Sequence, residues 1–198
     1  MNRLRIIAAV IAFLAIAGIA VGTAPTTDDD VVAPFAVRGG LGDTLETRVL
    51  TVTALDVARA SSLDVSYFEG LGTYPEKLTT DSNWIVVTVR LTATIEPVSL
   101  SNARLRIGDS EFRASEFLPR PAITDLLAGP GIAAVGSLAF EVSDAALASD
   151  GAESAELTFP TQFTTQLDEI ATVELDLRDI DSVPDYRVEK AVIVDGEK

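Results

Sequence analysis

The chain has 198 residues, with 15 lysines and arginines against 30 aspartates and glutamates and a formal net charge of −15. It contains neither cysteine nor histidine. This excludes disulfides, thiol chemistry, histidine-dependent nucleophiles and zinc sites built from these ligands. The acidic balance repels nucleic acid phosphates, so we expect no nucleic acid partner.

The N-terminal segment has the plan of a membrane-targeting sequence. Arg3 and Arg5 precede an apolar run over residues 6–24, which as a helix would measure about 28 Å against a bilayer core of about 30 Å. The pattern predicts a signal anchor over residues 1–24, a transmembrane helix that crosses the cytoplasmic membrane once through residues 6–24. The basic residues keep the N-terminus cytoplasmic, so the rest of the chain would be extracytoplasmic.

A cleaved signal peptide is the alternative interpretation of the same segment. Small residues allow a cut after Gly22 or after Ala24. Pro25 would follow the second cut and should obstruct it. The sequence therefore favours the anchor and leaves cleavage open.

Two further regions follow the apolar run. Residues 25–34 are polar, acidic and bounded by prolines, which predicts a short linker. Residues 35–198 are long enough for one domain with its own core. Within them, the glycines at 39–42 predict a flexible connection to the first strand.

Period-two alternation dominates the domain and predicts β-strands. The longest example runs from Trp84 to Ile95. Its predicted core face carries Ile85, Val87, Val89, Leu91, Ala93 and Ile95. Its opposite face carries Trp84, Val86, Thr88, Arg90, Thr92 and Thr94. Pro97 should end this strand because proline cannot donate to a sheet ladder.

The remaining predicted strands are short. They cover residues 49–57, 104–107, 111–113, 133–142, 156–159, 172–177 and 187–194. Gly108, Asp109 and Ser110 predict a hairpin turn, and residues 121–127 and 144–148 predict single helical turns. Seven or eight short strands without a long helix indicate an all-β sandwich.

A family resemblance covers about residues 45–159. It is carried by Trp84-Ile85-Val86-Val87, by the turn at 97–101, by the hairpin at 105–112 and by the stretches at 126–131 and 136–142. In these stretches the chain resembles the telokin-like, immunoglobulin-like domains of exported bacterial proteins, a family of unknown function. The resemblance implies an immunoglobulin-like antiparallel β-sandwich on the cell envelope. It implies no activity.

The acidic residues offer one weak metal candidate. Asp176, Asp179, Asp181 and Asp185 lie near a predicted strand end, and Ca²⁺ prefers carboxylate oxygens. Their spacing does not match an EF-hand, so we favour a solvated loop and expect neither a metal site nor a cofactor.

These observations predict a non-catalytic interaction or accessory module of the bacterial envelope, whose partner is an unknown envelope or membrane protein. Two alternatives are a carboxylate-dependent envelope hydrolase and a calcium-stabilised adhesion module.

Overall fold

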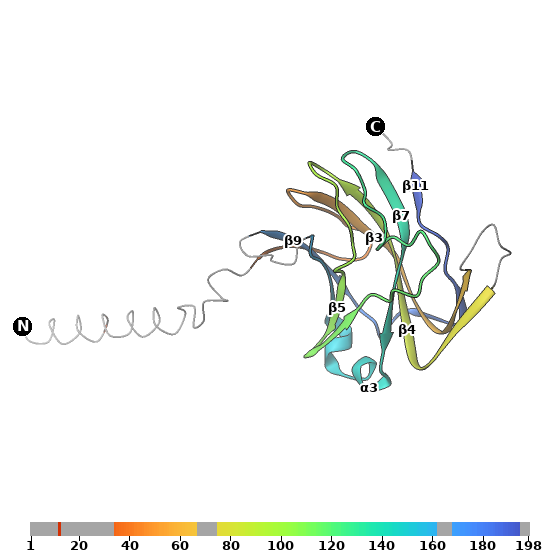
Figure 1. The fold of residues 1–198 in the computed structure, drawn as a ribbon. Coiled ribbons are helices and arrows are strands. Elements are labelled where there is room, and N and C mark those ends of the chain that lie inside the picture. The colour runs from red at the N-terminus through yellow and green to blue at the C-terminus, as the bar shows by residue number, and fades with distance from the viewer. Residues whose placement is uncertain (1–11, 13–33, 67–74, 162–167, 195–198) are drawn as a thin grey trace, which may run out of the picture. The chain divides into compact units, whose positions relative to one another are not determined.

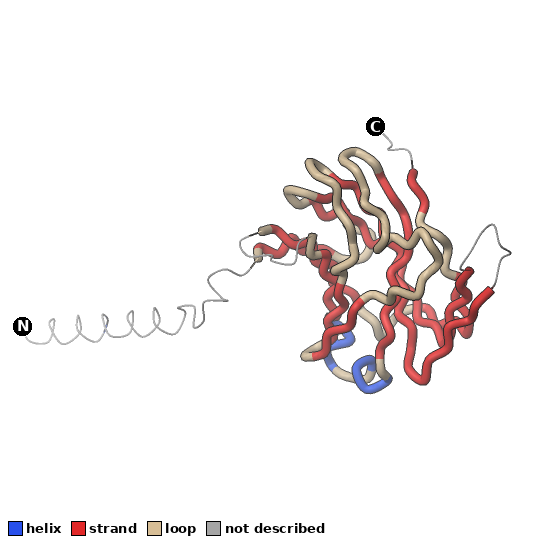
Figure 2. The backbone as a smooth tube through the Cα atoms, in the orientation of Figure 1, coloured by secondary structure: helices blue, strands red, loops and turns tan. Residues whose placement is uncertain are grey.

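The computed structural model describes residue 12 and residues 34–66, 75–161 and 168–194. The predicted anchor and linker therefore lie outside the described residues, apart from Ala12 and Pro34. Within the described part, no helix is long and apolar enough to cross a membrane. From Pro34 onward the chain forms one compact unit, in which strands predominate (Figure 2).

The unit is a sandwich of two β-sheets (Figure 1). The first sheet has the order β1-β9-β8-β5-β6. Its strands are β1 (Phe35–Gly39), β9 (Glu169–Leu175), β8 (Ala155–Phe159), β5 (Arg104–Ile107) and β6 (Ser110–Arg113). We call it sheet A.

The second sheet, sheet B, has the order β10-β3-β4-β7-β11, with β2 also paired to β3. Its strands are β10 (Asp181–Arg187), β3 (Leu50–Ser66), β4 (Pro75–Ala93), β7 (Ala133–Val142), β11 (Val192–Val194) and β2 (Thr44–Glu46). Helix α3 (Asp144–Leu147) and the 3₁₀-helix η1 (Asp150–Ser154) connect β7 to β8.

Among the described strands, pairing is antiparallel except at two places. Strand β1 runs parallel to β9, and β10 runs parallel to β3. The predicted sandwich is thus present, but its sheets are mixed rather than wholly antiparallel. Each parallel pair joins strands that lie more than 100 residues apart in sequence, and the local sequence pattern does not reveal such a pairing.

The main core lies between the two sheets. The predicted inner face of β4 is correct for the five residues from Ile85 to Ala93, all of which are at most 1% exposed. Alternation places every second side chain on this face. Ile95 is a correction, because it is 58% exposed. Strand β4 ends at Ala93, and beyond that residue the alternation no longer determines the side-chain direction.

A second apolar cluster lies on the other face of sheet B. Trp84 and Val86 belong to it, together with Leu118, Ala122 and Val188. The predicted outer face of β4 is therefore buried at Trp84 and Val86. The chain around Leu118 and around Val188 covers this face, so β4 contributes to two cores.

The segment around Val188, which covers this face, also corrects the strand predicted at 187–194. Residues 187–194 do not form one strand. The amide of Val188 donates to the Asp64 carbonyl beside β3, whereas that of Ala191 donates to the Pro121 carbonyl. The chain thus leaves β3 and crosses to β7, where it becomes β11.

Other predicted elements are found close to their expected places. The strand predicted at 133–142 coincides with β7, and the one at 49–57 is the first half of the longer β3. The hairpin turn is Gly108-Asp109, with Gly108 in the left-handed region at φ 55°. The helical turn predicted at 144–148 is α3. The one predicted at 121–127 is a non-helical turn, and Gly39 belongs to β1 rather than to a flexible connection.

Candidate functional site

A row of alternating charges crosses the outer face of sheet A. We call it the charged strip, and it consists of Arg38, Arg104, Arg106, Glu111, Glu156 and Glu174. In β5, Arg104 and Arg106 alternate with Leu105 and Ile107, which are buried in the core. The same alternation places Glu156 and Glu174 outside on β8 and β9. The strip therefore follows from the pleat of the sheet.

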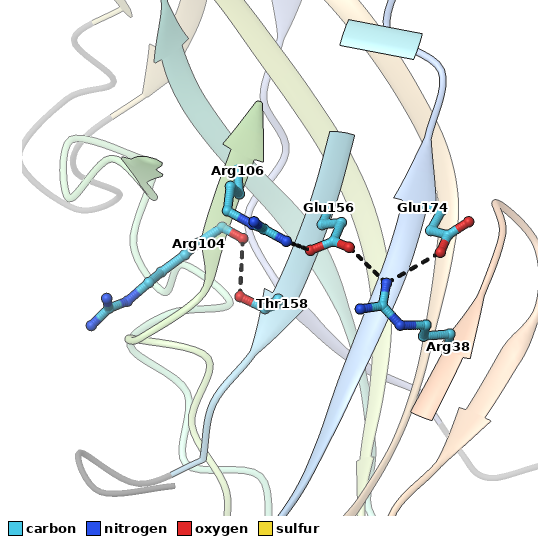
Figure 3. Close-up of polar contacts among 6 residues, drawn as sticks. All are labelled: Arg38, Arg104, Arg106, Glu156, Thr158 and Glu174. Atoms are coloured by element: carbon cyan, nitrogen blue, oxygen red, sulfur yellow. Dashed lines mark hydrogen bonds and ion pairs between the residues drawn. The ribbon is translucent and has the colours of Figure 1, made fainter. Parts of the chain in front are cut away.

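Glu156 is the centre of the charged strip (Figure 3). Its Oε1 accepts a hydrogen bond from Arg38 Nη1 at 2.6 Å, and its Oε2 accepts one from Arg106 Nη2. Arg38 Nη1 also donates to Glu174 Oε1 at 3.2 Å. The Glu156 side chain is only 17% exposed. The hydrogen bonds from Arg38 and Arg106 lower the pKa of Glu156, and the contacts with Glu156 and Glu174 raise the pKa of Arg38.

Further contacts extend the strip to the edge of the sheet. Arg104 Nη1 lies 2.8 Å from Glu111 Oε1 on β6. The Thr158 hydroxyl donates to the Arg104 carbonyl (Figure 3). The charges in the strip thus compensate one another.

A polar hollow adjoins the strip at the α3 end of the sandwich. It is lined by Arg106, Gly108, Gly151, Ser154 and Glu156. Gly151 approaches the hairpin turn so closely that a Cβ there would lie 2.4 Å from the Gly108 nitrogen. Because Arg106 and Glu156 bind each other, the hollow presents a compensated pair to solvent.

The four predicted calcium candidates do not form a cage. Asp181 and Asp185 stand opposite Ala58 and Ser62 in the register of β10 with β3. This places their backbones about 13 Å apart, at about 3.3 Å per residue. Two oxygens on one Ca²⁺ must each lie about 2.3–2.6 Å from it. One ion therefore cannot join both carboxylates without leaving the strand geometry.

Two of these aspartates have hydrogen-bond partners of their own. Asp185 accepts hydrogen bonds from Ser62 and from Lys77, and the Lys77 contact lowers the pKa of Asp185. The Asp176 carboxylate accepts the backbone N–H of Arg178, and Asp179 is exposed. Among the described residues, no group of three or more acidic side chains is placed to hold a metal ion.

Of the exposed large apolar side chains, three lie on two hydrogen-bonded loops at the opposite end of the sandwich from α3. Ile95 is 58%, Leu127 69% and Ile132 44% exposed. Backbone hydrogen bonds hold these loops together, because Val98 and Ala128 each donate to the other's carbonyl and Gly131 donates to Ala93. We call Ile95, Leu127 and Ile132 the apolar loop end.

Sequence reasoning missed both the charged strip and the apolar loop end. Alternation of Arg104 and Arg106 with apolar residues could have placed two arginines on an outer face. The partner on β1 had no such signal, because Arg38 stands next to glycines that suggested a loop. The apolar loop end gave no signal either, because the alternation predicts Ile95 on the core face of a strand, whereas it is exposed.

Comparisons with known proteins add similarity in structure only. No family profile matches the sequence, and no curated protein matches it significantly. A candidate lipoprotein from Staphylococcus aureus subsp. aureus NCTC 8325 is 11% identical with a TM-score of 0.46, covering 75% of this chain and 97% of that one. A functionally unknown protein from Listeria monocytogenes EGD-e is 12% identical with a TM-score of 0.44, covering 70% and 83%.

An uncharacterised β-sandwich protein from Clostridium difficile 630 is 10% identical with a TM-score of 0.43, covering 77% of this chain and 99% of that one. TM-scores below 0.5 say nothing about the activity of this chain. Its two-sheet architecture rests on its own strand pairing.

Proposed function

We propose that the chain is a non-catalytic, extracytoplasmic interaction module of the cell envelope, held at the cytoplasmic membrane by residues 6–24. The apolar loop end carries this proposal. Large apolar side chains that gather on the surface of a soluble domain commonly mark a contact with a protein or a membrane. Here three of them stand on two loops fixed by backbone hydrogen bonds, so the surface is preformed.

The strand order supports an immunoglobulin-like topology. The neighbouring strands β9, β8, β5 and β6 of sheet A correspond in order to strands G, F, C and C′ of that fold. The neighbouring strands β3, β4 and β7 of sheet B correspond in order to strands A, B and E. Folds of this class present their loops at the two ends of the sandwich, and one of these ends carries the apolar loops.

The charged strip gives little support to a carboxylate-dependent hydrolase. A glycosidase needs one carboxylic acid that keeps its proton and a second carboxylate that acts as base or nucleophile. The arginine contacts lower the pKa of Glu156, which is the wrong direction for a general acid. Glu156 therefore does not fit the role of the general acid that this alternative needs.

Labelling in intact cells tests the proposal, because the chain contains no cysteine of its own. Single-cysteine variants Leu127→Cys and Asp109→Cys place one thiol at the apolar loop end and one at the hairpin turn at the other end. We expect a membrane-impermeant maleimide to label Asp109→Cys in intact spheroplasts. Leu127→Cys should be labelled several-fold more slowly until detergent is added.

Two outcomes would contradict the proposal. If Asp109→Cys is labelled only after lysis, the domain is not extracytoplasmic. If both positions are labelled at equal rates in intact cells, nothing covers the apolar loop end. Deletion of residues 6–24 is the control for tethering and should release the protein from the membrane fraction.

A further inference from the structure

The chain enters the domain at the same end as the apolar loops. Phe35, the first residue of β1, donates its backbone N–H to the Asp168 carbonyl. Asp168 also pairs with Arg48 at 3.2 Å, and the Arg48 amide donates to Glu169 at 2.7 Å. The start of β1 therefore lies beside the loop that precedes β3.

The next contacts lead from that loop to the apolar side chains. Thr94 donates its amide to the Val49 carbonyl, next to Arg48 in sequence. Ala93 then accepts the Gly131 amide, and Ile132 follows directly. Phe35, the loop before β3 and the loops with Ile95 and Ile132 thus belong to one end of the sandwich.

The tether limits how far this end can stand from the membrane. Eleven residue steps separate Ala24, the last residue of the apolar run, from Phe35. At full extension they span about 40 Å, and a flexible chain of this length has a mean span of about 20 Å. A contact surface tethered this closely experiences a millimolar effective concentration of its target. Even a weak contact would then be occupied.

We infer that the apolar loop end rests in the surface of the lipid bilayer, with Ile95, Leu127 and Ile132 entering the region between headgroups and acyl chains. This inference rests on the proposed tether and names the partner of the proposed surface. The chemistry selects an electrically neutral lipid surface, since the domain is strongly acidic and anionic lipid would repel it. Ile and Leu supply the apolar area that such a contact buries.

Fluorescence quenching in reconstituted membranes tests the contact. The full chain, with a polarity-sensitive fluorophore on Leu127→Cys or Asp109→Cys, is reconstituted into phosphatidylcholine vesicles that contain brominated acyl chains. We expect at least a twofold loss of fluorescence at position 127 and none at position 109. Replacement of half of the lipid by phosphatidylglycerol should weaken the quenching.

A matched variant separates contact from proximity. Ile95→Ser combined with Ile132→Ser changes two exposed side chains, and unchanged thermal unfolding would show that the fold is kept. We expect this variant to lose at least half of the quenching at position 127. Unaltered quenching would overturn the inference.

The remaining outcomes distinguish this inference from the proposed function. A chain that does not float with the vesicles lacks the tether, and both fail together. A chain that floats while position 127 is no more quenched than position 109 overturns the bilayer contact alone. Protection of position 127 in native membranes but not in pure lipid would show that a protein covers the loops, and would also overturn it.

Discussion

Glu156 and Glu174 stand directly opposite each other in the register of β8 and β9, and the Arg38 guanidinium on β1 bonds to both. Like charges in directly opposed positions destabilise a sheet. One arginine therefore turns an unfavourable pair into a bridge that fastens the edge strand β1 to its neighbours. Because β1 is the first strand of the described domain, this bridge secures the start of sheet A.

Replacement of the bridging arginine should destabilise the domain. Arg38→Gln removes the charge and leaves the two carboxylates opposed. Arg38 and Glu174 are largely exposed, so we expect a loss of only about 1 kcal/mol in the free energy of unfolding. Urea unfolding monitored by circular dichroism measures it. Arg113→Gln, at an exposed arginine on β6, should change stability by less than half as much; equal losses would show that the bridge has no special role.

The lowered pKa of Glu156 predicts how the stability of the domain changes with pH. Its ordinary value is 4.5 and the arginine contacts lower it in the folded state. The contribution of the strip is then fully present above pH 4.5 and is lost as pH falls through the depressed folded pKa. Glu156→Gln should be less stable than the wild type at neutral pH, and the difference should shrink below pH 4.5. A constant difference from pH 7 to pH 3 would contradict the assignment, and Glu116→Gln serves as the exposed control.

The sequence predicts well what depends on local alternation. Ile85 and Val87 point into the core because neighbouring residues of a strand face opposite sides, and β7 is found at its predicted bounds. The charged strip depends on a different kind of information. Arg38 meets Glu156 and Glu174 across 118 and 136 residues of sequence. No local pattern specifies that β1 inserts parallel to β9.

The second apolar cluster, on strand β4, shows the same limit of prediction from local pattern. The alternation correctly predicts Trp84 and Val86 on the outer face of β4, but Leu118 and Val188 cover that face. Whether an outer face is exposed to solvent depends on whether a later part of the chain crosses it. The error at Ile95 has a related cause, since the strand ends where the chain turns toward sheet A.

The two faces of β4 can be tested by placing a charge on each. Val89→Asp would bury an unpaired carboxylate in the main core and should prevent folding. Val86→Asp should be nearly as damaging, because the second cluster buries Val86. Thr88→Asp lies on the same side as Val86 at a half-buried position beside Tyr186, and should cost far less. Soluble yield and thermal unfolding measure the effect of each of the three substitutions. An equal loss of stability in Thr88→Asp would show that the outer face is buried there as well.

Calcium should not stabilise the domain specifically. Asp185 is engaged by Lys77 and Ser62, and the strand spacing holds Asp181 too far from Asp185 to share an ion. A ligand that binds only the folded state would raise its stability by about 2.7 kcal/mol at 100 times its Kd. We therefore expect the melting temperature to be the same in millimolar calcium as in chelator, apart from charge screening that magnesium reproduces. Suppose instead that calcium alone raises it by several degrees, and that Asp179→Asn with Asp181→Asn abolishes the rise. The adhesion-module alternative would then replace the interaction module proposed above, because the acidic loop would be the functional site.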